Sequence, residues 1–195
     1  MRRPSYRDTG LLILLLVAAF SYLPINHRLI HGGTVLAGSL DYKIPLVAGF
    51  AVPYLFFLPV LAAVVLLAFF KRLDFQRLAW SLIAIYLLSD VIFLTFHTYT
   101  PRLCLTHGLL QLVYDHDRPY CDLPSEHVAS AVIMMIYSWR FKAWRWVMLA
   151  FGIIVIASTL LIKQHTILGT IAGAALAALV WICLTKVVHR GKLRT

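Results

Sequence analysis

The chain has 195 residues, of which 61% are hydrophobic and 13% are charged, and its formal net charge at pH 7 is +10. A water-soluble domain of this length needs more polar surface, so the composition excludes a soluble globular protein. The positive charge is divided among short segments instead of forming one patch, which argues against a nucleic-acid partner. The sequence therefore indicates an integral membrane protein with a single domain, residues 1–195.

Six apolar runs follow one another along the chain, and each is a candidate membrane-spanning helix. They cover residues 10–25, 46–70, 78–97, 128–139, 144–162 and 166–184. The fourth run is short, and we expect it to begin nearer Pro124. The first run lacks a small-residue cleavage site, so we expect it to be retained. These runs predict an all-α fold, a six-helix transmembrane bundle.

Lysine and arginine residues are unevenly distributed between the two sides of this bundle. The side away from the termini carries only Arg28, Lys43, Arg102, Arg118 and Lys163 of the 18 basic residues. The positive-inside rule then predicts that both termini are cytoplasmic. We expect a multi-pass protein of a bacterial-type plasma membrane, with the other connections on the extracytoplasmic face.

The longest outer connection, residues 98–127, concentrates the polar chemistry of the chain. Long loops in compact proteins are usually functional, although a solvated charged loop is the alternative. Residues 109–114 within it predict a short amphipathic element at the membrane interface. We expect this loop and the turn at residues 163–165 to form the functional site together.

Three segments on the outer side place cationic or imidazole groups at helix ends. They read TPRL with Arg102, RPYCDLPSEHVAS with Ser125 and His127, and STLLIKQHTILGTIAG with Lys163 and His165. Arginine offers a fork, and lysine a point charge, to phosphate oxygens, and a helix N-terminus adds backbone N–H groups. Two histidines facing one phosphate divide the work, since one attacks phosphorus and the other protonates the leaving oxygen. Each residue alone also suits a helix-end anchor, but their combination predicts a phosphate site.

In order and spacing, these three motifs resemble the type-2 phosphatidic acid phosphatase superfamily, and in particular its branch of inositol phosphorylceramide and sphingomyelin synthase-like proteins. The resemblance runs from about residue 98 to residue 173. It implies that His165 is the nucleophile that forms a phosphohistidine and that His127 is the general acid. It also implies that Arg102, Ser125 and Lys163 hold the phosphate oxygens without a metal or other cofactor.

The chain departs from the family pattern at Gly169, where the family places an aspartate that holds the nucleophilic imidazole. Asp90 and Glu126 are the predicted substitutes, because a carboxylate at membrane depth is a functional candidate. Glu126 also places a negative charge beside the predicted phosphate site. An alternative is a protein that keeps the phosphate-binding groups but has weak or no turnover. Gly169 further belongs to a small-residue face with Gly173 and Ala177, which predicts close helix packing.

The outer loop also holds two cysteines, Cys104 and Cys121. An exported loop allows a disulfide between them, and two unpaired thiols are the alternative. The segment YDHDRPYC invites a metal-site interpretation, but its spacing fits no standard zinc pattern, so we expect no metal.

The expected function is that of a membrane lipid phosphatase or phosphotransferase acting at the outer membrane surface. Its expected partners are the lipid bilayer and a membrane lipid that carries a phosphate or diphosphate. The sequence leaves open whether the acceptor is water or an alcohol. A catalytically weak or inactive protein that binds lipid phosphates is the alternative.

Overall fold

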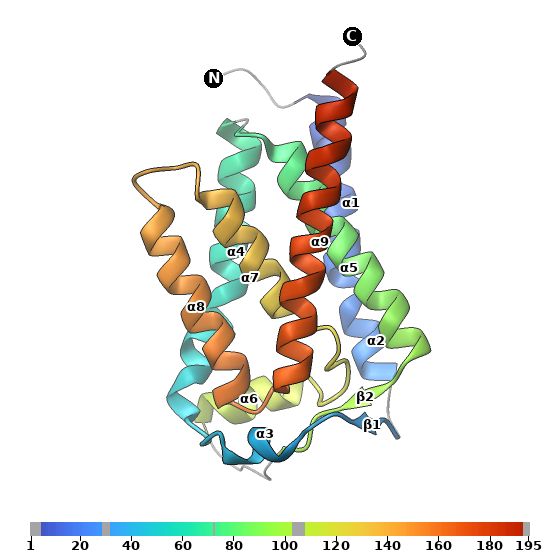
Figure 1. The fold of residues 1–195 in the computed structure, drawn as a ribbon, viewed down its shortest axis with the longest axis vertical. Helices are drawn as coiled ribbons and strands as arrows, with labels where there is room; N and C mark the ends of the chain where they lie inside the picture. Colours follow the sequence, from blue (N-terminus) through green and yellow to red (C-terminus); the bar gives the residue numbers. More distant parts are fainter. Residues whose placement is uncertain (1–4, 29–31, 72, 103–107, 193–195) are drawn as a thin grey trace.

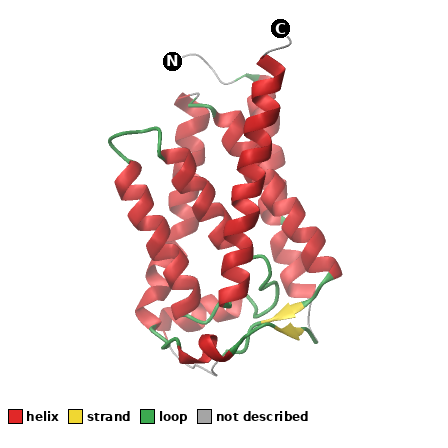
Figure 2. Cartoon of the chain, viewed as in Figure 1, coloured by secondary structure: helices red, strands yellow, loops and turns green. Residues whose placement is uncertain are grey.

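The computed structural model describes residues 5–28, 32–71, 73–102 and 108–192, which form helices and one small pair of strands (Figures 1 and 2). The long helices are α1 (Tyr6–Phe20), α4 (Ala51–Lys71), α5 (Phe75–Thr95), α7 (Glu126–Ser138), α8 (Arg145–Leu161) and α9 (Ile167–Lys192). The shorter elements are α2 (Tyr22–Arg28), β1 (Thr34–Val35), α3 (Ser39–Lys43), the 3-10 helix η1 (Ala48–Phe50), β2 (Thr98–Tyr99) and α6 (Gly108–His116). The prediction of an all-helical protein is therefore confirmed.

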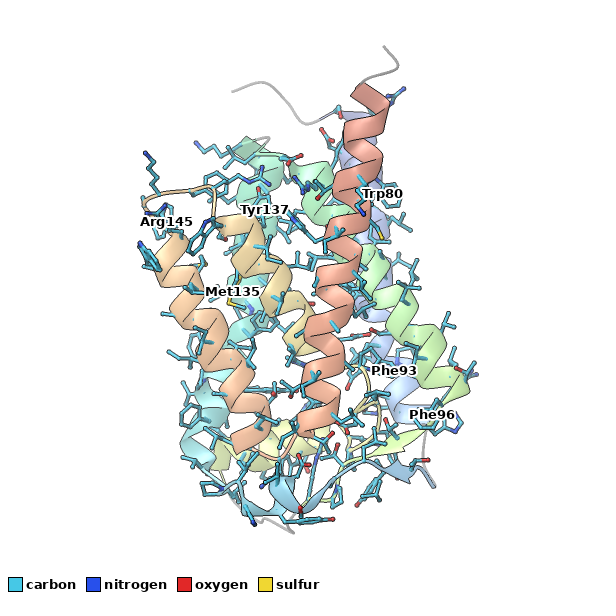
Figure 3. The ribbon with its side chains drawn as sticks, in the orientation of Figure 1. Trp80, Phe93, Phe96, Met135, Tyr137 and Arg145 are labelled. Carbon is cyan, nitrogen blue, oxygen red and sulfur yellow. The ribbon has the colours of Figure 1, made fainter. Side chains whose placement is uncertain are left out.

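Helix α7 lies in the middle of the bundle and packs against α4, α5, α8 and α9 (Figure 1). Its side chains Ile133, Met134 and Tyr137 are buried in the main hydrophobic core. Met135, labelled in Figure 3, lies against Gly152 of α8, where an added Cβ would come within 2.5 Å of the Met135 side chain. Helix α1 packs mainly on α5, at the side of the bundle.

Four segments within the described residues are long and apolar enough to cross a membrane. They are Tyr6–Arg28, Ala48–Lys71, Phe75–Thr95 and Ile167–Lys186. The predicted runs at residues 128–139 and 144–162 also form helices, α7 and α8, but these have only 13 and 17 residues. The composition and these four helices indicate a membrane protein.

The two ends of the bundle differ. The start of α1 and the end of α9 lie at one end, near Tyr137 and Arg145, whereas α3, α6 and the strands cover the other end (Figures 1 and 3). We call this second end the loop end. There β1 and β2 pair in parallel, and the Thr100 amide donates to the Pro119 carbonyl at 2.8 Å. The connections before α4, after α5 and before α7 are thereby held together.

The first half of α9 packs closely against the chain segment that leads into α7. A Cβ at Gly169 would lie 2.4 Å from the Asp122 carbonyl oxygen, and one at Gly173 would lie 2.4 Å from the Ser125 carbonyl oxygen. The Ser125 amide also donates to the Gly169 carbonyl at 3.0 Å. Only glycine permits this approach, and Ala177 is fully buried further along the helix. The predicted close packing is confirmed at Gly169 and Gly173, although the surface that they contact is the segment before α7 and not another helix.

Candidate active site

The loop end brings the two predicted histidines together. His127 is the second residue of α7, and His165 lies in the turn between α8 and α9. Their ring centroids are 6.2 Å apart. The turn is fixed by its backbone, because Lys163 adopts a left-handed conformation (φ 56°) and the His165 amide donates to the Thr159 carbonyl at 3.1 Å. Two imidazoles from separate parts of the chain therefore lie close together.

His165 is oriented by a carboxylate. Its Nδ1 lies 3.3 Å from Asp122 Oδ1 and 3.2 Å from the Asp122 carbonyl oxygen, and its side chain is almost fully buried. The other ring nitrogen, Nε2, is buried and has no hydrogen-bond partner among the described residues. A histidine whose Nδ1 is hydrogen-bonded and whose Nε2 has no partner is suited to act as a nucleophile through Nε2.

Asp122 is itself held firmly. It is 1% exposed, and its two carboxylate oxygens accept from the backbone amide of Thr166 at 2.8 Å and from the Thr166 hydroxyl at 2.6 Å. Burial raises the pKa of Asp122, but the hydrogen bonds from His165 and Thr166 and the His165 charge outweigh burial and leave this pKa below its ordinary value. The carboxylate is therefore ionised at neutral pH.

The carboxylate on His165 is thus Asp122, and not Asp90 or Glu126, the two predicted from the sequence. Asp90 instead accepts a hydrogen bond from Ser21 at 2.5 Å. Glu126 is buried at the start of α7, with one carboxylate oxygen unpartnered among the described residues. Sequence reasoning missed Asp122, although it lies within the same motif as His127. The sequence signal for Asp122 was an acidic residue in the motif of His127 combined with a glycine, in place of an acid, at position 169.

His127 has a different environment. Its ring stacks on Tyr54 of α4, with ring centroids 4.3 Å apart, and Phe57 lies 5.9 Å away. The Tyr54 hydroxyl is 3.3 Å from His127 Nδ1 and donates to Asp117 Oδ2 at 2.5 Å. His127 therefore reaches a carboxylate only through a tyrosine.

A cavity of about 370 Å³ lies beside His165, and we call it the polar cavity. Arg102 and Lys163 line it, together with Asp41, Tyr42 and Thr166. Three of the residues predicted to bind or attack phosphate, Arg102, Lys163 and His165, therefore share one space.

Arg102 uses one of its side-chain nitrogens in a hydrogen bond and leaves two others unpaired within the described part of the chain. Its Nη1 donates to the Asp117 carbonyl at 2.7 Å, and its guanidinium lies 4.5 Å from the centroid of the Tyr114 ring. Its Nε and Nη2 are buried without a partner among the described residues. Two adjacent N–H donors left unpaired match two oxygens of one phosphate group.

Lys163 and Ser125 are more constrained than the sequence suggested. Lys163 Nζ donates to the carbonyls of Asp41 and Ile44, and burial lowers its pKa, with Asp41 opposing part of that shift. The Ser125 hydroxyl caps α7 by accepting from the Val128 amide at 3.4 Å, and it lines neither this cavity nor the next. The structure thus does not bring Ser125 to the polar cavity.

A second cavity, which we call the apolar cavity, runs between α1 and α4 and has a volume of about 670 Å³. Its walls are mostly aliphatic side chains of α1, α4 and α5, and His127, Tyr54 and Asp117 line it near the loop end. His127 thus faces an apolar space, whereas His165 faces a polar one. Nothing in the motifs indicated this second cavity.

The remaining sequence predictions concern cysteines and metal. Cys121 is a free and buried thiol, and its predicted partner Cys104 lies outside the described residues. Within residues 5–28, 32–71, 73–102 and 108–192, no cluster of three or more histidine, cysteine or acidic side chains is placed to hold a metal ion.

No family model matches the chain, and comparisons with curated proteins and with solved structures also found no match. The case for a function therefore depends on the geometry of the two cavities and the two histidines.

Proposed function

We propose that the chain is an integral membrane enzyme that cleaves the phosphate ester or diphosphate of a lipid by transferring a phosphoryl group to His165. One observation carries the proposal: the two imidazoles lie 6.2 Å apart, one lining a cationic cavity and the other an apolar cavity. A lipid phosphate has both characters at a single bond. Its anionic group matches Arg102, and its tail matches the aliphatic walls.

In the first step, the Nε2 lone pair of His165 forms a bond to phosphorus, and the bond from phosphorus to the lipid oxygen breaks. His127 gives a proton to that oxygen, so an alcohol leaves rather than an alkoxide. Asp122 keeps the proton on Nδ1 of His165 and stabilises the positive charge that develops on this ring. The products are a phosphohistidine and a free lipid alcohol, or a lipid monophosphate from a diphosphate.

In the second step, an acceptor hydroxyl attacks the phosphohistidine. His127, now neutral, takes the acceptor's proton, and the bond from phosphorus to His165 breaks. Arg102 offsets the charge of the transferring group in both steps, and such electrostatic stabilisation carries most of phosphoryl-transfer catalysis. Water as the acceptor makes the protein a phosphatase, and a lipid or head-group alcohol makes it a phosphotransferase.

The position of the lipid tail follows from the role of His127. The leaving oxygen must lie beside the acid, and His127 lines the apolar cavity. The tail therefore belongs to the leaving group and extends between α1 and α4. This arrangement lets a lipid enter sideways from the bilayer.

The proposal includes the predicted topology, with six spans, both termini in the cytoplasm and the site on the extracytoplasmic face of a plasma membrane. The common end of α1 and α9 in Figure 1 supports an even number of spans. The concentration of lysine and arginine at that end supports its cytoplasmic placement.

The test is phosphate release from dioleoyl phosphatidic acid and from a polyprenyl diphosphate by purified protein in lipid nanodiscs. We expect His165→Ala to lower kcat by at least about 10⁴-fold and His127→Ala by about 10²–10⁴-fold. His97→Ala removes an exposed imidazole that lines neither cavity, and it serves as the matched control. Rapid quenching in base should trap labelled phosphate on the wild type and not on His165→Ala. Equal activity in all four proteins would refute the mechanism.

The second candidate is a protein that binds lipid phosphates without turnover. The two donors of Arg102 that are unpaired among the described residues, Nε and Nη2, favour it, because they can bind a phosphate without any chemical step. This candidate predicts no phosphate release together with binding of phosphatidic acid vesicles that is lost in Arg102→Ala. The Gly169 argument for inactivity is weakened by the contact between Asp122 and His165.

A further inference from the structure

Three side chains from three separate elements are connected in series at the edge of the apolar cavity. Asp117 follows α6, Tyr54 belongs to α4, and His127 belongs to α7. The Tyr54 hydroxyl donates to Asp117 Oδ2 at 2.5 Å and lies 3.3 Å from His127 Nδ1. The mechanism above uses His127 but gives no role to the other two residues.

The proton positions in this series follow from the number of donors. A tyrosine hydroxyl has one hydrogen, and that hydrogen goes to Asp117. The contact between Tyr54 and His127 is therefore a hydrogen bond only when Nδ1 of His127 carries a proton and donates it. The protonated ring then has its second proton on Nε2, which is the one available for transfer, and the neutral Nδ1–H tautomer remains after the transfer.

Asp117 carries the charge that this arrangement needs. Burial raises its pKa, but the positive charges of His127 and Arg102 and the hydrogen bonds from Tyr22 and Tyr54 outweigh burial and leave this pKa below its ordinary value. Burying an imidazole disfavours its cationic form, and a nearby carboxylate opposes that penalty. An ionised Asp117 thus offsets part of the penalty that burial places on the protonated state that His127 needs as an acid.

The main chain of Asp117 links the same residue to the rest of the site. Its carbonyl oxygen accepts from Arg102 Nη1 at 2.7 Å and from Gln164 Nε2 at 3.1 Å. Gln164 precedes His165 in the turn. One residue is therefore in contact with the phosphate-binding arginine and with the turn that carries the nucleophile, and it reaches the acid through Tyr54.

We propose that Asp117, acting through the Tyr54 hydroxyl, is the positioning residue that sets the tautomer and favours the protonated state of His127. This role rests on the proposed function, because it specifies how the general acid of that reaction is prepared. It differs from the role of Asp122, which acts on the nucleophile.

The test compares two substrates that differ in their need for an acid. Dihexanoyl phosphatidic acid releases an alcohol, which requires a proton, whereas 4-nitrophenyl phosphate releases a stable phenolate that does not. Tyr54→Phe removes the hydroxyl and retains the ring that stacks on His127. We expect it to lower kcat on the alkyl ester by about 10–10²-fold and on the aryl ester by no more than about 3-fold. Asp117→Asn should show the same selectivity with a larger loss.

Tyr137→Phe is the matched control, since it removes another tyrosine hydroxyl at the opposite end of the bundle (Figure 3). It should leave the ratio of the two activities unchanged. An equal loss on both esters in Tyr54→Phe, or no loss on either, would overturn the positioning role while leaving the proposed function intact. A wild-type protein that turns over neither ester would overturn the proposed function and this inference with it.

Discussion

The polar cavity is lined by His165 and the apolar cavity by His127, and the two cavities are built in different ways. The polar cavity is assembled mostly from loop and turn residues together with α3. Hydrogen bonds to main-chain carbonyls fix its charged groups, as in the contacts from Lys163 to Asp41 and from Arg102 to Asp117. The apolar cavity is the space left between α1 and α4, with aliphatic side chains as its walls. The comparison teaches that main-chain contacts at the loop end position the charged groups of the polar cavity, whereas the spacing of α1 and α4 sets the shape of the apolar cavity. In the proposed reaction, the first would hold the phosphate and the second would select the lipid tail.

The largest expected effect is in the polar half of the site. Asp122→Asn removes the charge that orients His165, so kcat should fall by about 10³–10⁴-fold on short-chain and long-chain lipid phosphates alike. Asp122 also accepts from a backbone amide at the start of α9, and Asp41→Asn is the control for that contact. Asp41 accepts from the Ile167 amide of the same helix at 2.7 Å without contacting His165. Its effect should be much smaller. A loss below about 10-fold in Asp122→Asn would contradict the orienting role.

A second, smaller effect tests how the loop end packs. Gly169→Asp places an aspartate where the resembled phosphatase superfamily has one, yet its Cβ would lie 2.4 Å from the Asp122 carbonyl oxygen and 2.6 Å from Oδ1. We expect activity to fall by about 10²-fold, since displacing the catalytic groups by about 1 Å reduces the rate by that factor. Gly169→Ala should act in the same direction. Gly10→Ala is the control, as nothing lies within 4 Å of its added Cβ. A gain of activity in Gly169→Asp would show that Asp122 does not orient His165.

The smallest expected effect is confined to the apolar half. Ala62→Trp fills the apolar cavity about 12 Å along α4 from Tyr54, at 1.5 Å per residue. It should raise KM for dioleoyl phosphatidic acid by about 10-fold and leave the dihexanoyl ester unaffected. Ala63→Trp is the matched control, because Ala63 is also exposed but does not line the cavity. Equal effects of the two variants would mean that the tail lies elsewhere.

The sequence predicted well those features that depend on local composition. Apolar runs located all six long helices, and the three motifs located Arg102, His127, Lys163 and His165 near one another. These predictions succeed because the hydropathy of a segment indicates a membrane helix without reference to other segments. Charged residues in an apolar chain are also costly, so those that are present are usually functional.

The sequence could not predict features that depend on how separate elements approach. The contact between Asp122 and His165 exists because Gly169 lets α9 come close to the segment before α7, and spacing along the chain does not encode that approach. The relation between Tyr54 and His127 requires α4 to lie beside α7. The apolar cavity requires α1 to pack on α5 and to leave space beside α4. Because these helices are all similarly apolar, their sequences do not indicate which two remain apart.

The close approach of Asp122 to Gly169 also restricts where this fold can hold an acid. An aspartate at 169 is incompatible with the present course of the 122–125 segment, because its side chain would occupy the volume of that backbone. Any sequence that adopts this fold should accordingly hold an acid at one of these two sites, and rarely at both.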